Sequence, residues 1–187
     1  GTLRLTGSAS VTGGGGARVA AGGTLLIEQP AGTFTLDDPL ELAGGTIDAV
    51  GNLRLTGTAT VSGQSTLVGS GTTTLAGPLV SGSIAGGITK GGSGLLVVSS
   101  TANGYQGPTR VTAGMLAVSG RIYAGTVGDE AAIAVTTGTL YTANFSDLPV
   151  GSLGNLPASS DRISIDGGTL RIAGSGTTAR GFTVGAG

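Results

Sequence analysis

The 187-residue sequence contains no cysteine, no histidine and no tryptophan. Without cysteine and histidine the chain can build neither a Ser-His-Asp or Cys-His catalytic arrangement nor an ordinary zinc site. Aromatic residues make up only 3% of the chain, so the core must take its apolar area from many small aliphatic side chains. These absences favour a fold of thin, repeated layers.

Charge is scarce as well, at 10% of residues with a net charge of −1. The charged residues are scattered singly, and no basic stripe is present that could neutralise the phosphates of a nucleic acid. No apolar run approaches the roughly 20 residues that a membrane span needs. Nucleic acid and a membrane span are therefore not expected. Because mean hydropathy is positive and net charge is low, the chain is expected to fold.

Glycine supplies 39 residues, and it interrupts every window that could keep a helical 3.6-residue apolar period. Short runs alternate apolar and polar side chains instead, as in residues 3–6 and 162–165. That alternation is typical of half-buried β-strands. The sequence therefore predicts an all-β fold.

Internal repetition defines the architecture. Residues 1–11 and 51–61 are identical at eight of eleven positions. A looser unit, Gly-x-Leu or Gly-x-Ile, recurs at steps of 20–24 residues with one final step of 30; its aliphatic members are Leu3, Leu25, Ile47, Leu53, Leu75, Leu96, Leu116, Leu140 and Leu170. This period predicts a parallel β-helix, or β-solenoid, of about eight or nine coils.

In such a solenoid the repeated aliphatic side chains point inward and stack on their equivalents in neighbouring coils. Glycine is expected at tight corners, where positive φ penalises other residues. Outward threonines suit the strand surface because of their β-branching. The long step is expected to hold a projecting loop over 144–160, which is rich in Pro, Gly, Asn and Ser.

One 29-residue segment, residues 90–118, carries a family pattern. It reads Lys90-Gly-Gly-Ser-Gly94-Leu-Leu96-Val-Val98-Ser99, then Asn103-Gly-Tyr105-Gln-Gly107-Pro-Thr109-Arg-Val111, then Gly114-Met-Leu116-Ala-Val118. It resembles the passenger-associated, or autotransporter-associated, β-strand repeat, with Ser100 where the family has glycine. The resemblance implies a right-handed β-helix that is extracellular or on the outer surface of a Gram-negative-type bacterium. It marks a scaffold and no single activity.

Three carboxylate pairs are candidates for hydrolytic chemistry, namely Asp37/Asp38, Asp129/Glu130 and Asp161/Asp166. Neighbouring residues on a strand point to opposite faces, so the first two pairs cannot both aim at one substrate from a strand. Solvated loop carboxylates are the ordinary interpretation. We therefore assign no residue to catalysis, cofactor binding or metal binding, and expect no enzyme and no cofactor.

Other short patterns point to binding less strongly. The Gly13–Gly16 run lacks the Lys-Ser/Thr of a phosphate loop and the Asp of a calcium β-roll, and it predicts a flexible corner. Single calcium sites on loops stay open. Tyr105, Tyr123 and Tyr141 recur every 18 residues and could stack sugars, although Tyr105 is a packing position in the family that it resembles. Thr72–Thr74 is too short for an ice-binding face.

The expected domain is one continuous solenoid segment over residues 1–187, without terminal caps. Joining Gly187 to Gly1 would recreate the string Ala21–Leu25, which predicts continuation at both ends. The partners would be flanking repeats of the same chain or copies of it stacked end to end. Three functions follow: a structural stalk, fibre or filament; an adhesin that binds extracellular glycans or matrix through the 144–160 loop or a tyrosine row; and, least favoured, a carbohydrate-active enzyme.

Overall fold

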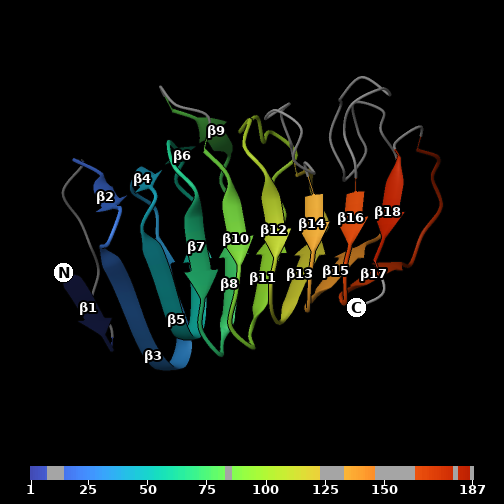
Figure 1. Ribbon diagram of the computed structural model, residues 1–187. Coiled ribbons are helices and arrows are strands. Elements are labelled where there is room, and N and C mark those ends of the chain that lie inside the picture. Colours follow the sequence, from blue (N-terminus) through green and yellow to red (C-terminus); the bar gives the residue numbers. More distant parts are fainter. Residues whose placement is uncertain (8–14, 83–85, 123–132, 146–162, 179–180, 186–187) are drawn as a thin grey trace.

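The computed structural model describes residues 1–7, 15–82, 86–122, 133–145, 163–178 and 181–185. Every regular element in these ranges is a β-strand, and the paired strands run parallel. Successive coils stack along one axis, from β1 at one end to β18 at the other (Figure 1). The expected parallel β-solenoid is confirmed. The described residues contain no helix that could cross a membrane.

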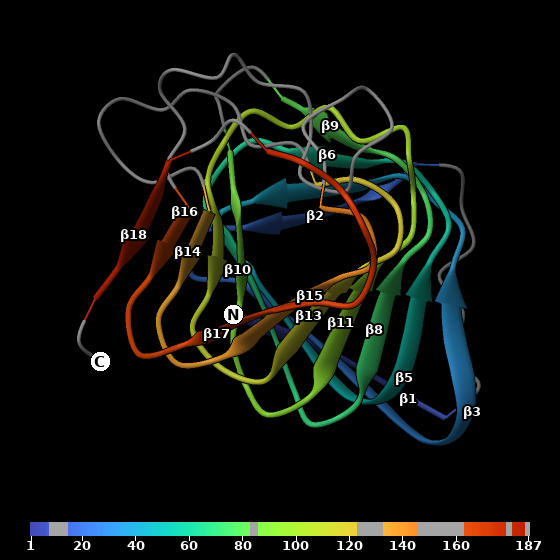
Figure 2. The same ribbon diagram turned by 90° about the vertical axis from the view of Figure 1, so that its right-hand side faces the viewer.

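Each coil has up to three sides, which are seen end-on in Figure 2. The first side stacks β1 (Thr2–Thr6), the first halves of β3 (Thr24–Leu36) and β5 (Thr46–Leu55), and then β7 (Ser65–Val68), β10 (Ile88–Lys90), β12 (Thr109–Val111), β14 (Ile133–Val135), β16 (Ile163–Ile165) and β18 (Phe182–Val184). The second side stacks the second halves of β3 and β5 and then β8 (Thr72–Leu75), β11 (Leu95–Val98), β13 (Met115–Val118), β15 (Thr139–Thr142) and β17 (Thr169–Ile172). The third side is a four-stranded sheet of β2 (Ala17–Ala20), β4 (Leu40–Ala43), β6 (Ala59–Val61) and β9 (Leu79–Ser81).

The solenoid has about seven turns, slightly fewer than the eight or nine coils expected from spacing. The difference lies at the two ends. Strands β1 and β18 occupy the first side, but neither is followed by a second-side strand in the described residues. The number expected from the sequence counts every repeated aliphatic residue as one coil. A full turn in the structure needs strands on at least two sides, so the first and last strands do not complete one.

The inward column of the first side follows the expected register. Leu3 pairs with Leu25, and Leu25 pairs with Ile47. The column of the second side needs one correction. Leu53 and Leu96 both pair with Thr73, whereas Leu75 pairs with Leu55 and Val98. Positions two apart on a strand share a face, so a leucine motif alone does not show which of the two inward columns a residue enters.

The strongest sequence repeat is not a structural equivalence. Residues 2–6 form β1 on the first side, whereas the matching residues 52–55 form the second half of β5 on the second side. All sides of a solenoid require the same inward–outward alternation, so similar strand sequences fit either side. The corners between strands decide which side a segment occupies.

Glycines form these corners, as expected. In the described residues, positive φ occurs only at glycine, including Gly92 and Gly114. At other corners close packing is the reason. A Cβ on Gly71 would lie 1.7 Å from the carbonyl oxygen of Gly51 in the preceding coil, and one on Gly94 would lie 2.2 Å from that of Gly71. Stacked glycines therefore let successive coils approach each other.

The third side changes character after β9, the last strand of its sheet. Beyond it the interior is filled by the buried side chains of Tyr105, Ile122 and Phe145. Phe145 also stacks on Phe182 with 5.6 Å between the ring centroids. The predicted loop over 144–160 begins next to this buried ring, and its residues from 146 onward lie outside the described ranges.

Candidate functional site

Lys90 is the only lysine of the chain, and it lies in the solenoid core. It ends β10 at an inward position, paired with Leu67 in the preceding coil and Val111 in the next. Only 3% of its surface is exposed. A buried ammonium must find hydrogen-bond acceptors, because losing water without compensation is costly. The surrounding corners supply them.

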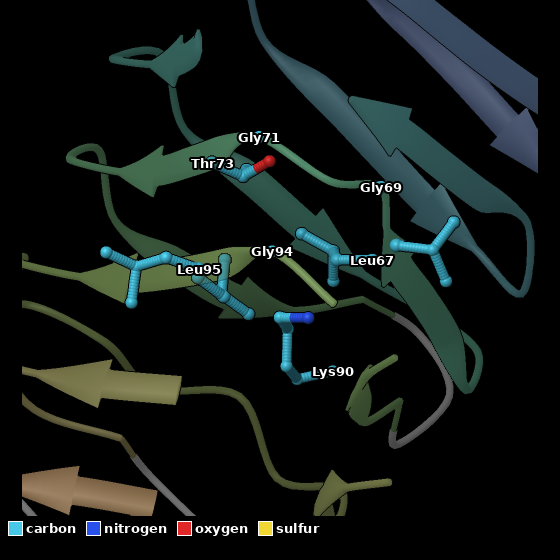
Figure 3. A pocket seen from close by; sticks show the side chains of 9 residues that line it. Leu67, Gly69, Gly71, Thr73, Lys90, Gly94 and Leu95 are labelled. Atoms are coloured by element: carbon cyan, nitrogen blue, oxygen red, sulfur yellow. The ribbon is translucent and has the colours of Figure 1, made fainter. Parts of the chain in front are cut away.

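The Lys90 Nζ donates to the carbonyl oxygens of Gly91, Gly92 and Ala113, at 2.9 Å for Gly92 and 3.4 Å for Ala113. Figure 3 shows the side chain directed toward the corner that leads to Gly94 and Leu95. Two of the acceptors belong to its own coil and one to the next. Burial lowers the pKa of Lys90 from its ordinary value. The ammonium thus joins two coils from inside.

The interior space beside Lys90 does not serve as a ligand pocket. It is lined by Leu67, Gly69, Gly71, Thr73 and Gly94, among others, and has no room for a water-sized sphere (Figure 3). A water molecule needs a larger space and several polar partners. Lys90 therefore has a structural role in the described state.

Asn103 closes the edge of the third-side sheet. Its Oδ1 accepts a hydrogen bond from the Leu79 backbone N–H at 2.8 Å, and the Gly104 N–H donates to the Leu79 carbonyl oxygen at 2.7 Å. A side-chain carboxamide and one backbone group thereby replace the strand that would follow β9. The Asn103 Nδ2 also donates to the Ser100 carbonyl oxygen at 3.1 Å and to that of Arg121.

Tyr105 is fully buried, and its hydroxyl lies 2.6 Å from the Thr109 Oγ1. Burial raises the pKa of Tyr105 well above its ordinary value, although the hydrogen bond with Thr109 opposes part of that rise. The expectation that Tyr105 is a packing position is therefore confirmed. A tyrosine row on the surface cannot include it.

Four polar residues of the 90–118 pattern thus make hydrogen bonds inside the solenoid rather than forming a surface site. Lys90, Asn103, Tyr105 and Thr109 are all buried. Sequence reasoning missed Arg121, whose guanidinium donates to the Asn103 carbonyl oxygen at 2.7 Å. Arg121 lies beyond the end of the pattern, and no spacing signal marks it.

Three of the six candidate carboxylates lie in the described part of the chain, and they are Asp37, Asp38 and Asp166. Asp37 follows β3 and accepts a hydrogen bond from the Thr56 hydroxyl, and Asp38 is next to it. Asp166 is exposed after β16, whereas Asp129, Glu130 and Asp161 lie outside the described residues. Within the described ranges, no group of three or more acidic side chains is placed to hold a metal ion.

The remaining candidates are also placed. Gly15 and Gly16 lead into strand β2 rather than a helix, while Gly13 and Gly14 are outside the described ranges. Thr72–Thr74 lies in β8, with Thr73 buried. Tyr141 is on β15 with the Arg171 guanidinium 5.6 Å from its ring centroid. Tyr123 is not among the described residues.

Two hollows on the outer surface each contain a cross-coil ion pair. One hollow, of about 370 Å³, holds the pair of Arg4 and Glu28. The other, of about 360 Å³, holds the pair of Arg18 and Glu41, with 2.9 Å between the charged atoms. Their volumes fall within the range of about 300–1,000 Å³ that is usual for ligand pockets.

Comparison with known proteins gives one relative. The adhesin BmaC autotransporter of Brucella suis biovar 1 (strain 1330) is 32% identical to the chain over 123 residues. The matched segment covers 65% of this chain and 4% of the adhesin's length. No family model and no solved structure matches the chain. The similarity and the parallel β-solenoid both fit the autotransporter-associated passenger repeat that residues 90–118 resemble.

Proposed function

We propose that this chain is a segment of the exported passenger region of a bacterial surface protein, where it serves as a rod-like scaffold of adhesin type. The observation that carries this proposal is the similarity to an autotransporter adhesin, on a chain that folds as a parallel β-solenoid. Its location would be the outer surface of a Gram-negative-type cell, or the space outside it.

The geometry supports a scaffold. Each coil contacts mainly its two neighbours, so coils can be added without changing those already present. Two buried polar side chains are used inside the rod: Lys90 bonds corner carbonyls, and Asn103 closes a sheet edge. No enzymatic role is part of the proposal, because the similarity is to an adhesin and the fold is a β-solenoid.

Continuation of the rod is part of the same proposal. Leu3 and Val184 belong to the inward column of the first side, yet they are 58% and 73% exposed. Burying a leucine or valine side chain contributes about 1.5–3 kcal/mol, so these surfaces favour a further coil on each. Flanking repeats of a longer chain would supply such coils, and so would copies stacked end to end.

Surface location is tested with antibodies raised against residues 1–187 and applied to intact cells of the source bacterium. We expect labelling without permeabilisation, and loss of the label after external protease treatment. Labelling that appears only after the envelope is opened would refute the surface proposal.

Sedimentation and electron microscopy of the purified 187-residue chain distinguish whether the further coils come from flanking repeats or from stacked copies. Association into filaments as concentration rises would support end-to-end stacking of copies. Short single rods at every concentration would exclude copies and leave flanking repeats as the covering coils.

A further inference from the structure

The hollow beside Arg4 and Glu28 lies where three coils meet at the corner between the first and second sides. Thr6, Glu28 and Val50 form one outward column across β1, β3 and β5. They line the hollow together with Arg4, Gln29 and Pro30. With neighbouring strands about 4.8 Å apart, the column extends about 10 Å along the rod.

An irregularity in β3 shapes this hollow. The register of β3 with β5 shifts between Gln29 and Thr33, so that Pro30, Ala31 and Gly32 bulge outward. Two side chains hold the bulge: the Gln29 Nε2 donates to the Ala31 carbonyl oxygen at 2.6 Å, and the Asn52 Nδ2 donates to that of Gly32 at 3.3 Å. A wall fixed before binding loses little freedom on binding.

Unused acceptors lie along the hollow. The Gln29 Oε1 is buried and has no hydrogen-bond partner. The Ala31 carbonyl oxygen can only accept, so the amide nitrogen must face it and the oxygen is left over. Arg4 bonds to the Oε2 of Glu28. The Oε1 of Glu28 is left without a bond in the described residues. The Gln29 Oε1 is covered, so the Glu28 Oε1 is the unused acceptor that the hollow presents.

The balance of charge defines the class of ligand. Arg4 and Glu28 neutralise each other, so the hollow favours neither an anion nor a cation. It combines guanidinium donors and a carboxylate acceptor with an apolar wall of Pro30 and Val50, and Val50 is 45% exposed. A sugar presents the complementary surface: hydroxyl groups that both donate and accept, around an apolar ring face.

We infer that this corner hollow binds a neutral saccharide, with Glu28 accepting hydrogen bonds from its hydroxyls, Arg4 donating to them and Val50 packing on the ring. This site adds a binding activity to the proposed scaffold and does not depend on the surface location proposed above, which the antibody labelling tests separately.

The second ion-pair hollow supplies a matched control. Arg18 and Glu41 also pair across coils, and their hollow has a similar volume. Both oxygens of Glu41 are already engaged, however, because its Oε1 accepts a hydrogen bond from the Ser62 hydroxyl at 2.9 Å and its Oε2 contacts Arg18. Glu41 therefore lacks the free carboxylate oxygen that Glu28 offers in the first hollow.

The test screens the 187-residue chain on an array of neutral and acidic oligosaccharides. The neutral saccharide with the strongest signal is then titrated by calorimetry into the wild type and into Glu28→Ala, Val50→Asp and Glu41→Ala variants. We expect Glu28→Ala to weaken binding about tenfold or more, which is the effect of losing one or two good hydrogen bonds. Val50→Asp should weaken it as well, and Glu41→Ala should leave it unchanged.

Thermal unfolding of each variant verifies folding, and Val50→Asp at an exposed position replaces Glu28→Ala if that variant does not fold. Three results would overturn the inference: no neutral saccharide binds; binding is confined to acidic saccharides; or Glu28→Ala and Val50→Asp bind as well as the wild type. Equal losses in Glu28→Ala and Glu41→Ala would also overturn it, because the site would then not be the corner hollow.

Discussion

Lys90 occupies a core position that its neighbours along the column fill with aliphatic side chains. Leu67 precedes it and Val111 follows it in register. The position accepts a charge because three corner carbonyls surround the ammonium. The same carbonyls point into the core and would lack donors without it. The lysine and the carbonyls of its glycine-rich corner therefore depend on each other for their hydrogen bonds.

Replacing Lys90 with methionine keeps the length and apolar stem of the side chain but removes the donor. The Gly92 and Ala113 carbonyl oxygens then lose a charged partner, and such hydrogen bonds are worth about 1.5–3 kcal/mol each. Because some apolar burial is regained, we expect a net loss of about 1–3 kcal/mol in the free energy of unfolding. Denaturant titration measures it.

Arg54→Met is the control for this substitution, because Arg54 is an exposed side chain on β5. Its effect should remain within about 0.5 kcal/mol, as is usual for surface positions. A Lys90→Met variant as stable as the wild type would contradict the role given to the ammonium.

Tyr105 provides a prediction that depends on pH. At neutral pH the Tyr105→Phe variant should lose about 1 kcal/mol, because the Thr109 hydroxyl loses its partner. The folded pKa of Tyr105 lies above its ordinary value of 10.0, so above that pH the unfolded state ionises first. The wild type should then lose up to about 1.4 kcal/mol per pH unit relative to the variant.

The measurement is urea unfolding of both proteins from about pH 8 to about pH 11, which spans the ordinary tyrosine pKa. Effects from Lys90 and the other tyrosines are common to both proteins and cancel in the difference. A stability difference that stays constant across this range would show that Tyr105 ionises alike in the folded and unfolded states.

At the scale of strands and corners, glycines of successive coils are in contact, and this contact leaves no room for a larger residue at those positions. A Cβ at Gly71 would lie 1.7 Å from the Gly51 carbonyl oxygen, which is backbone and cannot turn aside. We expect Gly71→Ala to lower the free energy of unfolding by about 1–3 kcal/mol or more, because overpacking typically costs that much. Thermal unfolding would measure the loss.

Gly104→Ala is the control, since a Cβ there would meet nothing within 4 Å. It should change stability by no more than about 0.5 kcal/mol. Equal stability of the two variants would mean that the coils can separate at the Gly71 corner at little energetic cost.

Much of the fold could be predicted at this scale, because alternation and a 20–24-residue period are direct consequences of parallel stacking. The Leu3, Leu25 and Ile47 column followed from that period. The side of the solenoid did not, because residues 2–6 and 52–55 share a sequence pattern and occupy different sides. Thr73 could not be placed in the core either, since threonine is ordinarily an outward strand residue.

The candidate site was less predictable still. The hollow at Glu28 arises where the register of β3 with β5 shifts between Gln29 and Thr33, and the repeat spacing does not mark that shift. Arg4 and Glu28 are 24 residues apart in the sequence, which is about one coil, and they meet only because their strands β1 and β3 are paired in adjacent coils. Asp37 and Asp38 were candidates for hydrolytic chemistry because they are adjacent in the sequence. In the structure they lie at the corner between β3 and β4.

At the scale of the whole molecule, the solenoid is a stack in which each coil interacts with the coil before it and the coil after it. Stability should then be close to a sum of coil and interface contributions. A complete coil can be removed if the two new neighbours present the same register. The chain offers such a coil between Ser65 and Thr89.

Deleting residues 66–88 joins Ser65 to Thr89. Thr89 already pairs with Thr66, so it can take the place of Thr66 beside Thr46. Residues 95–98 similarly replace 72–75 beside 52–55, because both segments share one register. On the third side Asn103 would close the edge at Ala59 instead of Leu79, since these two residues are paired.

We therefore expect the 66–88 deletion to fold into a rod one coil shorter, with a parallel-β circular dichroism spectrum and a cooperative but lower unfolding transition. The smaller deletion of residues 66–76 is the control. It removes most of β7 and all of β8 but leaves β9, so the strands on either side lose their partners without regaining a register. If the smaller deletion proved as stable as the complete one, the matched register would not be what holds the stack together.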